Sequence, residues 1–340
     1  MKKFLNTLYI LTSESYPHMR NQTIVVEING EEKASIPAHT IDSIVCFGKN
    51  IVSTPLIGFC AEKGISIVFL SEHGRFYGRV CGPVSGNVLL RKKQYESLSD
   101  ETFAVQTVKN ILYAKICNGK SVLMRSARNQ KKDLFKQDLY VAAQKLSDLA
   151  QKLDTVDSID SMRGIEGAAA TIYFSQFDTI LDSDDFVFDI RSRRPPKNEV
   201  NAMLSFVYTL LTREMQSALE TVGLDPAAGY LHTLRPGRPS FALDMMEELR
   251  APLCDRFVVA LFHKKQLKKT DFETDAEAVY LNDRGRRKVL TAWQKRKEES
   301  IKHPFLSENI EIGLIPYAQA MLFARVLRGD LDEYPPYLWR

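Results

Sequence analysis

The sequence has few cysteines, and those it has form no pattern. Five cysteines are scattered along 340 residues, and no pair has the spacing of a zinc site. This argues against a disulfide framework and a structural zinc centre. We therefore predict reduced, buried thiols of a cytoplasmic protein. The five are Cys46, Cys60, Cys81, Cys117 and Cys254.

Long hydrophobic runs are also lacking. No segment approaches the length needed to span a bilayer, so we expect no membrane partner. The N-terminus, "MKKFLNTLYILTSES", begins like a signal peptide. Its apolar stretch is too short and too polar, and it has no cleavage site, so we predict a strand there.

The excess of one charge sign is small. The formal net charge is +4 and the isoelectric point about 8.6, which permits a nucleic-acid partner without requiring one. Internal repeats and low-complexity tracts are absent from the sequence. The composition is that of a globular protein, and the length favours two domains.

The first 85 or so residues favour β-structure. Short runs rich in β-branched and aromatic residues alternate with turn signals such as "NGEE" and "EHGR". One helix interrupts them at residues 54–64, with Ser53 or Thr54 as its cap and Gly64 as its stop. The expected strands lie within residues 6–11, 22–28, 42–47, 65–71 and 74–82.

Residues 81–87, "CGPVSGN", read as a linker, and helical periodicity begins at Val88. We predict an α+β fold in which a small β-sandwich-like domain, 1–87, precedes a larger all-α domain, 88–340, that carries the functional site. The expected helices are 88–99, 101–129, 133–154, 158–178, 198–222, 240–265, 283–303 and 310–328.

One carboxylate stands out in "GIEGAAATIYF", where Glu166 lies among glycine, alanine and apolar residues. Helical spacing puts Glu166 on the same stripe as Ala170, Tyr173 and Phe177, so its side chain should face inward. Burying an ionised carboxylate is costly unless a cation or a donor meets it. Either a structural salt bridge, for example to Arg163, or a metal ligand or catalytic acid would satisfy this condition.

A second group of polar residues lies in residues 229–256. His232 occupies a loop, and Asp244 and Glu247 lie three apart on the following helix, with Glu248 beside them. Taken alone, the acids suggest a solvated acidic face opposite an apolar one. A divalent cation between Asp244 and Glu247 would remove their mutual repulsion.

Glu166, His232, Asp244 and Glu247 are more informative when they are considered together. Imidazole and carboxylate ligands suit Mn²⁺ or Mg²⁺, with positions left for water and phosphate oxygens. Basic clusters near these candidates favour a phosphodiester substrate. The clusters contain Arg191, Arg193, Arg194 and Lys197; Arg235 and Arg238; Lys264, Lys265, Lys268 and Lys269; and Arg284, Arg286 and Arg287.

Three stretches together, "RGIEGAAATIYF", "PPKNEVNAMLSFVYTLL" and "GYLHTLRPGRPSFALDMMEELRAPLCDR", resemble the CRISPR-associated endonuclease and integrase of the adaptation module, the first-numbered protein of that system. The resemblance covers essentially the whole chain. The size, the β-then-α order and the C-terminal "YPPYLWR" are most similar to subtype I-C members.

The resemblance implies a Mn²⁺ or Mg²⁺ site made by Glu166, His232 and an acidic residue. Where the family usually has two aspartates, this chain has Asp244 and Glu247. We assign Glu247 as the third ligand and Asp244 as its support. The implied activity is metal-assisted phosphoryl transfer on double-stranded DNA, which nicks one strand or joins two and inserts new spacers into a CRISPR array.

The resemblance also implies partners. We expect a homodimer formed through the β-rich domain and a complex with the second-numbered adaptation protein. The basic clusters named above would then hold DNA. Two alternatives stay open: a metal-dependent repair or recombination nuclease without a CRISPR role, and a non-catalytic DNA-binding scaffold in which Glu166 and Asp244 form buried ion pairs.

Overall fold

The computed structural model describes residues 6–72, 76–82 and 88–339. The chain divides into two compact units. The first comprises Met1–Gly86, Leu281–Glu299 and Glu311–Gly313, and the second comprises Asn87–Tyr280, Ser300–Ile310 and Leu314–Arg340. The expected turn at residues 72–75 and the linker at 81–87 lie largely outside the described residues.

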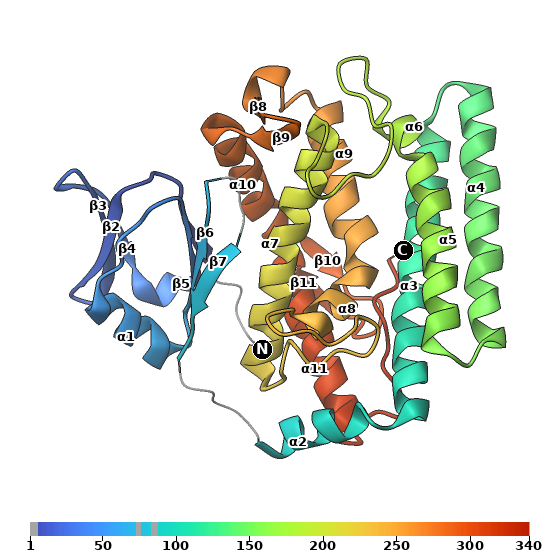
Figure 1. Cartoon of the computed structure of the whole chain (residues 1–340), viewed down its shortest axis with the longest axis horizontal. Coiled ribbons are helices and arrows are strands. Elements are labelled where there is room, and N and C mark those ends of the chain that lie inside the picture. Colours follow the sequence, from blue (N-terminus) through green and yellow to red (C-terminus); the bar gives the residue numbers. More distant parts are fainter. Residues whose placement is uncertain (1–5, 73–75, 83–87, 340) are drawn as a thin grey trace. The chain divides into compact units, whose positions relative to one another are not determined.

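The first unit contains two sheets (Figure 1). One has the order β1-β5-β6-β7, in which β1, β5 and β6 are parallel and β7 is antiparallel. The other is the antiparallel sheet β2-β3-β4. The strands are β1 (Asn6–Ile10), β2 (Ser15–Arg20), β3 (Thr23–Ile28), β4 (Glu31–Pro37), β5 (Ile41–Phe47), β6 (Ser66–Leu70) and β7 (Phe76–Val80).

Helix α1 (Thr54–Lys63) connects the parallel strands β5 and β6, which need a crossover between them. Its predicted ends are confirmed. Ser53 accepts a hydrogen bond from the backbone N–H of Leu56, and Gly64 ends the helix with a φ of 69°. Both sheets and α1 contribute side chains to one apolar cluster, for example Ile24, Ile44 and Leu56.

Two strands of the first unit escaped the sequence analysis. β2 contains Pro17 and His18, and β4 is mostly exposed and charged. Neither has the apolar alternation that marks a strand. Both exist because they pair with β3, whose apolar residues were recognised. The predicted turn after β3 is confirmed at Asn29 and Gly30, which have positive φ.

The second unit is mainly helical, which confirms the predicted α+β class. Helices α3, α4 and α5 pack side by side, and α7 packs against α8 and α11 (Figure 1). The helices are α2 (Val88–Ser97), α3 (Glu101–Asn129), α4 (Asp133–Lys152), α5 (Ile159–Ser175), α6 (Phe177–Leu181), α7 (Glu199–Val222), α8 (Ser240–Leu249), α9 (Arg256–His263) and α11 (Ile315–Leu327).

The C-terminal part of the chain is not purely α-helical. It contains two short two-stranded sheets, so the expectation of an all-α domain was too strict. They are β8 (Phe272–Asp275) with β9 (Ala278–Leu281), and β10 (Ser300–Lys302) with β11 (Asn309–Glu311). Helix α10 (Asp283–Lys297) groups with the first unit, whereas the predicted limits placed it in the second domain. It contacts β1, and Gln294 lies 3.1 Å from Asn6.

The predicted helix 240–265 is interrupted. A π-helical turn, Arg250–Asp255, separates α8 from α9. Pro252 has no backbone N–H to give to the carbonyl of Glu248, four residues earlier. Asn118 of α3 donates to that carbonyl instead, at 2.7 Å. The break therefore frees a backbone acceptor and ties α8 to α3.

The thiols partly match expectation. All five cysteines are described and none forms a disulfide there; Cys46, Cys60 and Cys254 are buried, but Cys117 is half-buried and Cys81 is exposed. Among the described residues, no helix combines the length and the apolar character that a bilayer span requires.

Candidate metal and DNA site

Glu166 lies on α5 and faces Lys115 on α3. Its carboxylate forms an ion pair and a hydrogen bond with the Lys115 ammonium. The side chain of Glu166 keeps 29% of its surface exposed, so it is less inward than predicted. Arg163, the partner suggested from the sequence, instead donates to the carbonyl of Leu231 and pairs with Asp160.

Glu247 lies on α8 and reaches the same lysine. Its Oε2 is 2.7 Å from Nζ of Lys115, and its Oε1 is 3.0 Å from NH1 of Arg250. The side chain is 3% exposed. Burial alone would raise the pKa of Glu247, but the positive charges of Arg250 and Lys115 outweigh it, helped by His232, and lower the pKa to about 2. Glu247 is therefore a carboxylate throughout the neutral range.

Asp244, one turn before Glu247, is fully buried and anchors the loop that carries His232. It accepts the backbone N–H groups of Tyr230, Leu231 and His232 at 2.6, 2.9 and 2.9 Å. The loop comes so close to α8 that a Cβ on Gly229 would lie 2.6 Å from the backbone of Ser240. Only glycine fits there, which lets the loop fold over the carboxylate.

His232 points from this loop toward Glu247. Its Nδ1 is 2.6 Å from Oδ1 of Asp244, and its Nε2 is 3.9 Å from Oε1 of Glu247. A carboxylate at Nδ1 favours the tautomer that leaves the Nε2 lone pair available as a ligand. Asp244 thus orients the imidazole, while Glu247 stands on the side of Nε2.

These contacts overturn one reading of α8. Asp244, Glu247 and Glu248 are all buried, so this helix does not present a solvated acidic face. The expected opposite, apolar side is buried as well, at Met246 and Leu249. Asp244 is tolerated inside because it accepts backbone N–H groups. Glu247 is tolerated because it pairs with the Lys115 and Arg250 cations.

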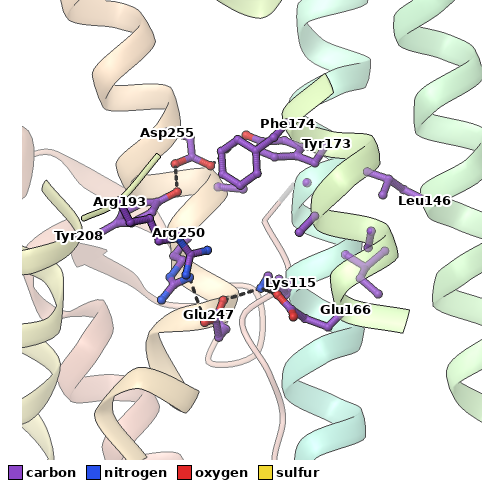
Figure 2. A pocket seen from close by; sticks show the side chains of 15 residues that line it. Lys115, Leu146, Glu166, Tyr173, Phe174, Arg193, Tyr208, Glu247, Arg250 and Asp255 are labelled. Atoms are coloured by element: carbon purple, nitrogen blue, oxygen red, sulfur yellow. Dashed lines mark hydrogen bonds and ion pairs between the residues drawn. The ribbon is translucent and has the colours of Figure 1, made fainter. Parts of the chain in front are cut away.

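The side chains that line the adjoining pocket come from α3, α4, α5, α7, α8 and the π-helical turn (Figure 2). Figure 2 shows Lys115 between Glu166 and Glu247, with Arg250 approaching Glu247. About 50 Å³ of the pocket is open to the centres of water molecules. That is room for a few waters or a hydrated ion, and too little for a nucleotide.

The donor set has the chemistry of a divalent-ion site: two carboxylates and one imidazole nitrogen. Within the described part of the chain, no three His, Cys, Asp or Glu side chains are already arranged to hold an ion. The Lys115 ammonium supplies the positive charge between Glu166 and Glu247. Oε2 of Glu247 is buried and faces that ammonium at 2.7 Å. The residues therefore fit a cation that takes the place of the ammonium.

Comparison with known proteins identifies the family of the chain. The family model described as CRISPR associated protein Cas1 matches residues 8–295. The chain is 46% identical over 347 residues to "CRISPR-associated endonuclease Cas1 2" of Rhodospirillum rubrum, and all of both chains is covered. The chain belongs to the Cas1 family. It is also 44% identical over 343 residues to "CRISPR-associated endonuclease Cas1 1" of Chlorobaculum tepidum, again with complete coverage of both.

Solved structures show the Cas1 fold. A Cas1 protein from Thermotoga maritima superposes with a TM-score of 0.83 at 24% identity, covering 96% of this chain and 97% of that one. A casposase bound to integration product also has a TM-score of 0.83, at 20% identity, covering 99% and 95%. The family resemblance seen in the sequence is confirmed by the family model and the two relatives.

The basic residues predicted to hold DNA fall into two groups. Arg286 is 4% exposed, donates to the carbonyl of Leu281 and pairs with Asp283. Arg191 donates to Asn201 and Ser205. Both guanidinium groups are used inside the fold, which argues against their assignment to DNA. Arg238 is half-buried, and the others are exposed: Arg193, Arg194, Lys197, Arg235, Lys264, Lys265, Lys268, Lys269, Arg284 and Arg287.

Sequence reasoning missed Lys115 and a second buried acid, Asp255. Asp255 accepts hydrogen bonds from Tyr208 at 2.6 Å and Tyr173 at 3.0 Å in the same pocket (Figure 2). Burial, opposed by these hydrogen bonds, raises the pKa of Asp255 to about 6. Lys115 is the one charged residue of the apolar stretch "ILYAKIC", and Asp255 lies beside Arg256 in the otherwise apolar "PLCDRFVV". That signal, which singled out Glu166, could have found both.

Proposed function

We propose that this Cas1-family protein is a metal-dependent DNA endonuclease and integrase that inserts spacer DNA into a CRISPR array. The observation that carries the proposal is that Glu166 and Glu247 share the Lys115 ammonium beside a pocket, with Nε2 of His232 3.9 Å from Oε1 of Glu247. Mn²⁺ or Mg²⁺ is the expected cofactor. A bound divalent cation would polarise a phosphodiester and stabilise the charge of its transition state.

The chain's own residues then have distinct tasks. Glu166, Glu247 and Nε2 of His232 would hold the cation, and Asp244 orients the imidazole from its Nδ1 side. Arg250 offsets the charge of Glu247. Arg193, which lines the pocket from its loop, would bind a DNA phosphate.

The partners belong to the same proposal. Solved structures with this fold include a "Cas6-RT-Cas1–Cas2 complex", with a TM-score of 0.84 at 21% identity over 36% of that chain, and the casposase with its integration product. They support double-stranded DNA and the second-numbered adaptation protein as partners. A homodimer formed through the β-rich first unit and membership of subtype I-C are further parts of the proposal.

The test is strand joining by Glu166→Gln. We expect loss of Mn²⁺-dependent insertion of a DNA end into a plasmid that carries a repeat, with the fold retained, because Glu166 is partly exposed. Asp160→Asn is the matched control, since Asp160 lies on the same helix and is 89% exposed. Wild-type joining by Glu166→Gln would refute the assignment.

Two further results separate the alternatives. Nicking without any preference for the repeat would indicate a repair or recombination nuclease. A protein that binds DNA but has no saturable Mn²⁺ site would be a scaffold.

A further inference from the structure

Lys115 occupies the position between the two carboxylates that the proposed function assigns to a cation. Its ammonium pairs with Glu166 and lies 2.7 Å from Oε2 of Glu247 (Figure 2). The lysine side chain is 18% exposed, so it lies at the edge of the pocket and is not sealed in the core. Helix α3 fixes the backbone position of Lys115, while the flexible lysine side chain can reach more than one partner.

The two oxygens of Glu247 are held differently. Oε1 pairs with Arg250 at 3.0 Å. Oε2 is buried and lies 2.7 Å from Nζ of Lys115, so the Lys115 charge is what compensates it. Taking Lys115 away without a replacement would leave this oxygen buried beside a second carboxylate, which is unfavourable. A divalent cation is a replacement of the right sign.

We propose that Lys115 is an internal counter-ion which Mn²⁺ or Mg²⁺ must displace from Glu166 and Glu247, and that the displaced ammonium then pairs with a DNA phosphate. This inference rests on the proposed metal site. Displacement lowers the apparent metal affinity of the free protein, because binding must first break the lysine's ion pairs.

The formal charges of Glu166, Glu247, Lys115 and Arg250 cancel. When a divalent cation joins them and the ammonium turns away from the carboxylates, the four groups and the cation together carry two positive charges, the displaced ammonium included. This excess positive charge favours binding of a DNA phosphate. Once the Lys115 ammonium pairs with that phosphate, it no longer competes with the metal for Glu166 and Glu247. Coupling of this kind is reciprocal, so DNA must strengthen metal binding by the factor by which metal strengthens DNA binding. The site would then load its cation preferentially when DNA is present.

The experiment measures the Mn²⁺ dissociation constant by isothermal titration calorimetry, with and without a short duplex, for wild type and Lys115→Met. Methionine keeps the length of the stem and removes the charge. Without DNA, we expect Lys115→Met to bind Mn²⁺ about tenfold more tightly, since the two ion pairs of Lys115 no longer compete with the metal. Duplex should tighten Mn²⁺ binding by wild type more than by Lys115→Met.

Lys120→Met is the matched control. Lys120 lies on the same helix and bonds Ser147 at 3.0 Å, away from the carboxylates, so its Mn²⁺ affinity should equal that of wild type. Circular dichroism checks the fold of each variant without metal. Should Lys115→Met not fold, Lys115→Gln, which retains a neutral donor, takes its place with the same expected direction.

The outcomes are distinguishable. If wild type shows no saturable Mn²⁺ binding that Glu166→Gln removes, the proposed function fails. If wild type binds but the Lys115 variant binds equally or less tightly, the counter-ion inference fails and the metal site stands. Equal tightening by DNA in both proteins would overturn the transfer of the ammonium to a phosphate.

Discussion

Oδ1 of Asp244 lies 2.6 Å from Nδ1 of His232 and also accepts the backbone N–H of the same residue at 2.9 Å. One carboxylate oxygen thus fixes both the main chain and the ring of His232. This turns Nε2 toward Glu247, so two acids three residues apart serve different purposes: Asp244 holds the imidazole, and Glu247 faces the pocket with Lys115.

The first prediction compares these two acids. Glu247→Gln should abolish strand joining, because a neutral amide poorly replaces a hard anionic oxygen. Asp244→Asn should reduce it by about 10–100-fold through the imidazole. Glu247→Asp should retain partial activity, since its arm is one methylene shorter. The measurement is joining against Mn²⁺ and Mg²⁺ concentration.

Stability gives the same comparison a second readout. Both oxygens of Asp244 accept backbone N–H groups, and an asparagine must turn its own donors toward some of them. Asp244→Asn should therefore also lower the free energy of unfolding, by about 1–3 kcal/mol. A fully active Glu247→Gln together with a dead Asp244→Asn of wild-type stability would reverse the two roles.

The second prediction concerns pH. Folding raises the pKa of Asp255 from 3.8 to about 6, mainly through burial. Between these values the native state binds more protons than the unfolded state, so this group's contribution to stability falls as the pH rises. Relative to Asp255→Asn, the wild-type free energy of unfolding should decrease by up to about 3 kcal/mol from pH 4 to pH 7.

Urea unfolding of both proteins across that pH range checks the effect, and the difference between them cancels the other titrating groups. A difference that is flat, or that grows with pH, would contradict a protonated Asp255 in the native state. The hydrogen bonds of Tyr173 and Tyr208 to Asp255 would then dominate over burial.

The third prediction concerns DNA. Arg193 and Arg194 are exposed, and Arg193 lines the pocket. Arg193→Glu combined with Arg194→Glu should weaken duplex binding whatever its sequence and flatten the salt dependence by about one log–log unit per lost phosphate contact. Fluorescence anisotropy at several salt concentrations measures both. Lys131→Glu with Lys132→Glu, an exposed pair with the same charge change between α3 and α4, is the control. Equal losses in the two variants would indicate a general charge effect.

The fourth prediction concerns the C-terminal tail. Asn118 donates to the carbonyls of Glu248 and Tyr337 at 2.7 Å and accepts the N–H of Trp339 at 2.8 Å. Asn118→Ala leaves these buried groups unsatisfied and should lower the free energy of unfolding by about 3 kcal/mol. Asn129→Ala, at the exposed end of the same helix, should change it little. Chemical denaturation measures both, and equal stability of the two variants would show that water replaces the amide.

Local features of this protein were predictable from the sequence. The ends of α1 follow from Ser53 and Gly64, because capping depends on residues within one turn. The α+β order followed from the change of periodicity near Val88. Glu166 stood out because an ionised group in an apolar run needs a partner somewhere. The family resemblance also rested on short motifs, which the sequence displays directly.

Only the tertiary structure decided which distant groups meet. Lys115, Glu166 and Glu247 come from three helices, and nothing local to any of them specifies the other two. The burial of Glu247 and Glu248 was hidden for the same reason: an acidic helix looks solvated until cations and donors from elsewhere compensate it. Strands β2 and β4 likewise exist through pairing with β3. Propensity and periodicity act over a few residues, whereas ion pairs, strand pairs and burial are set when the chain packs.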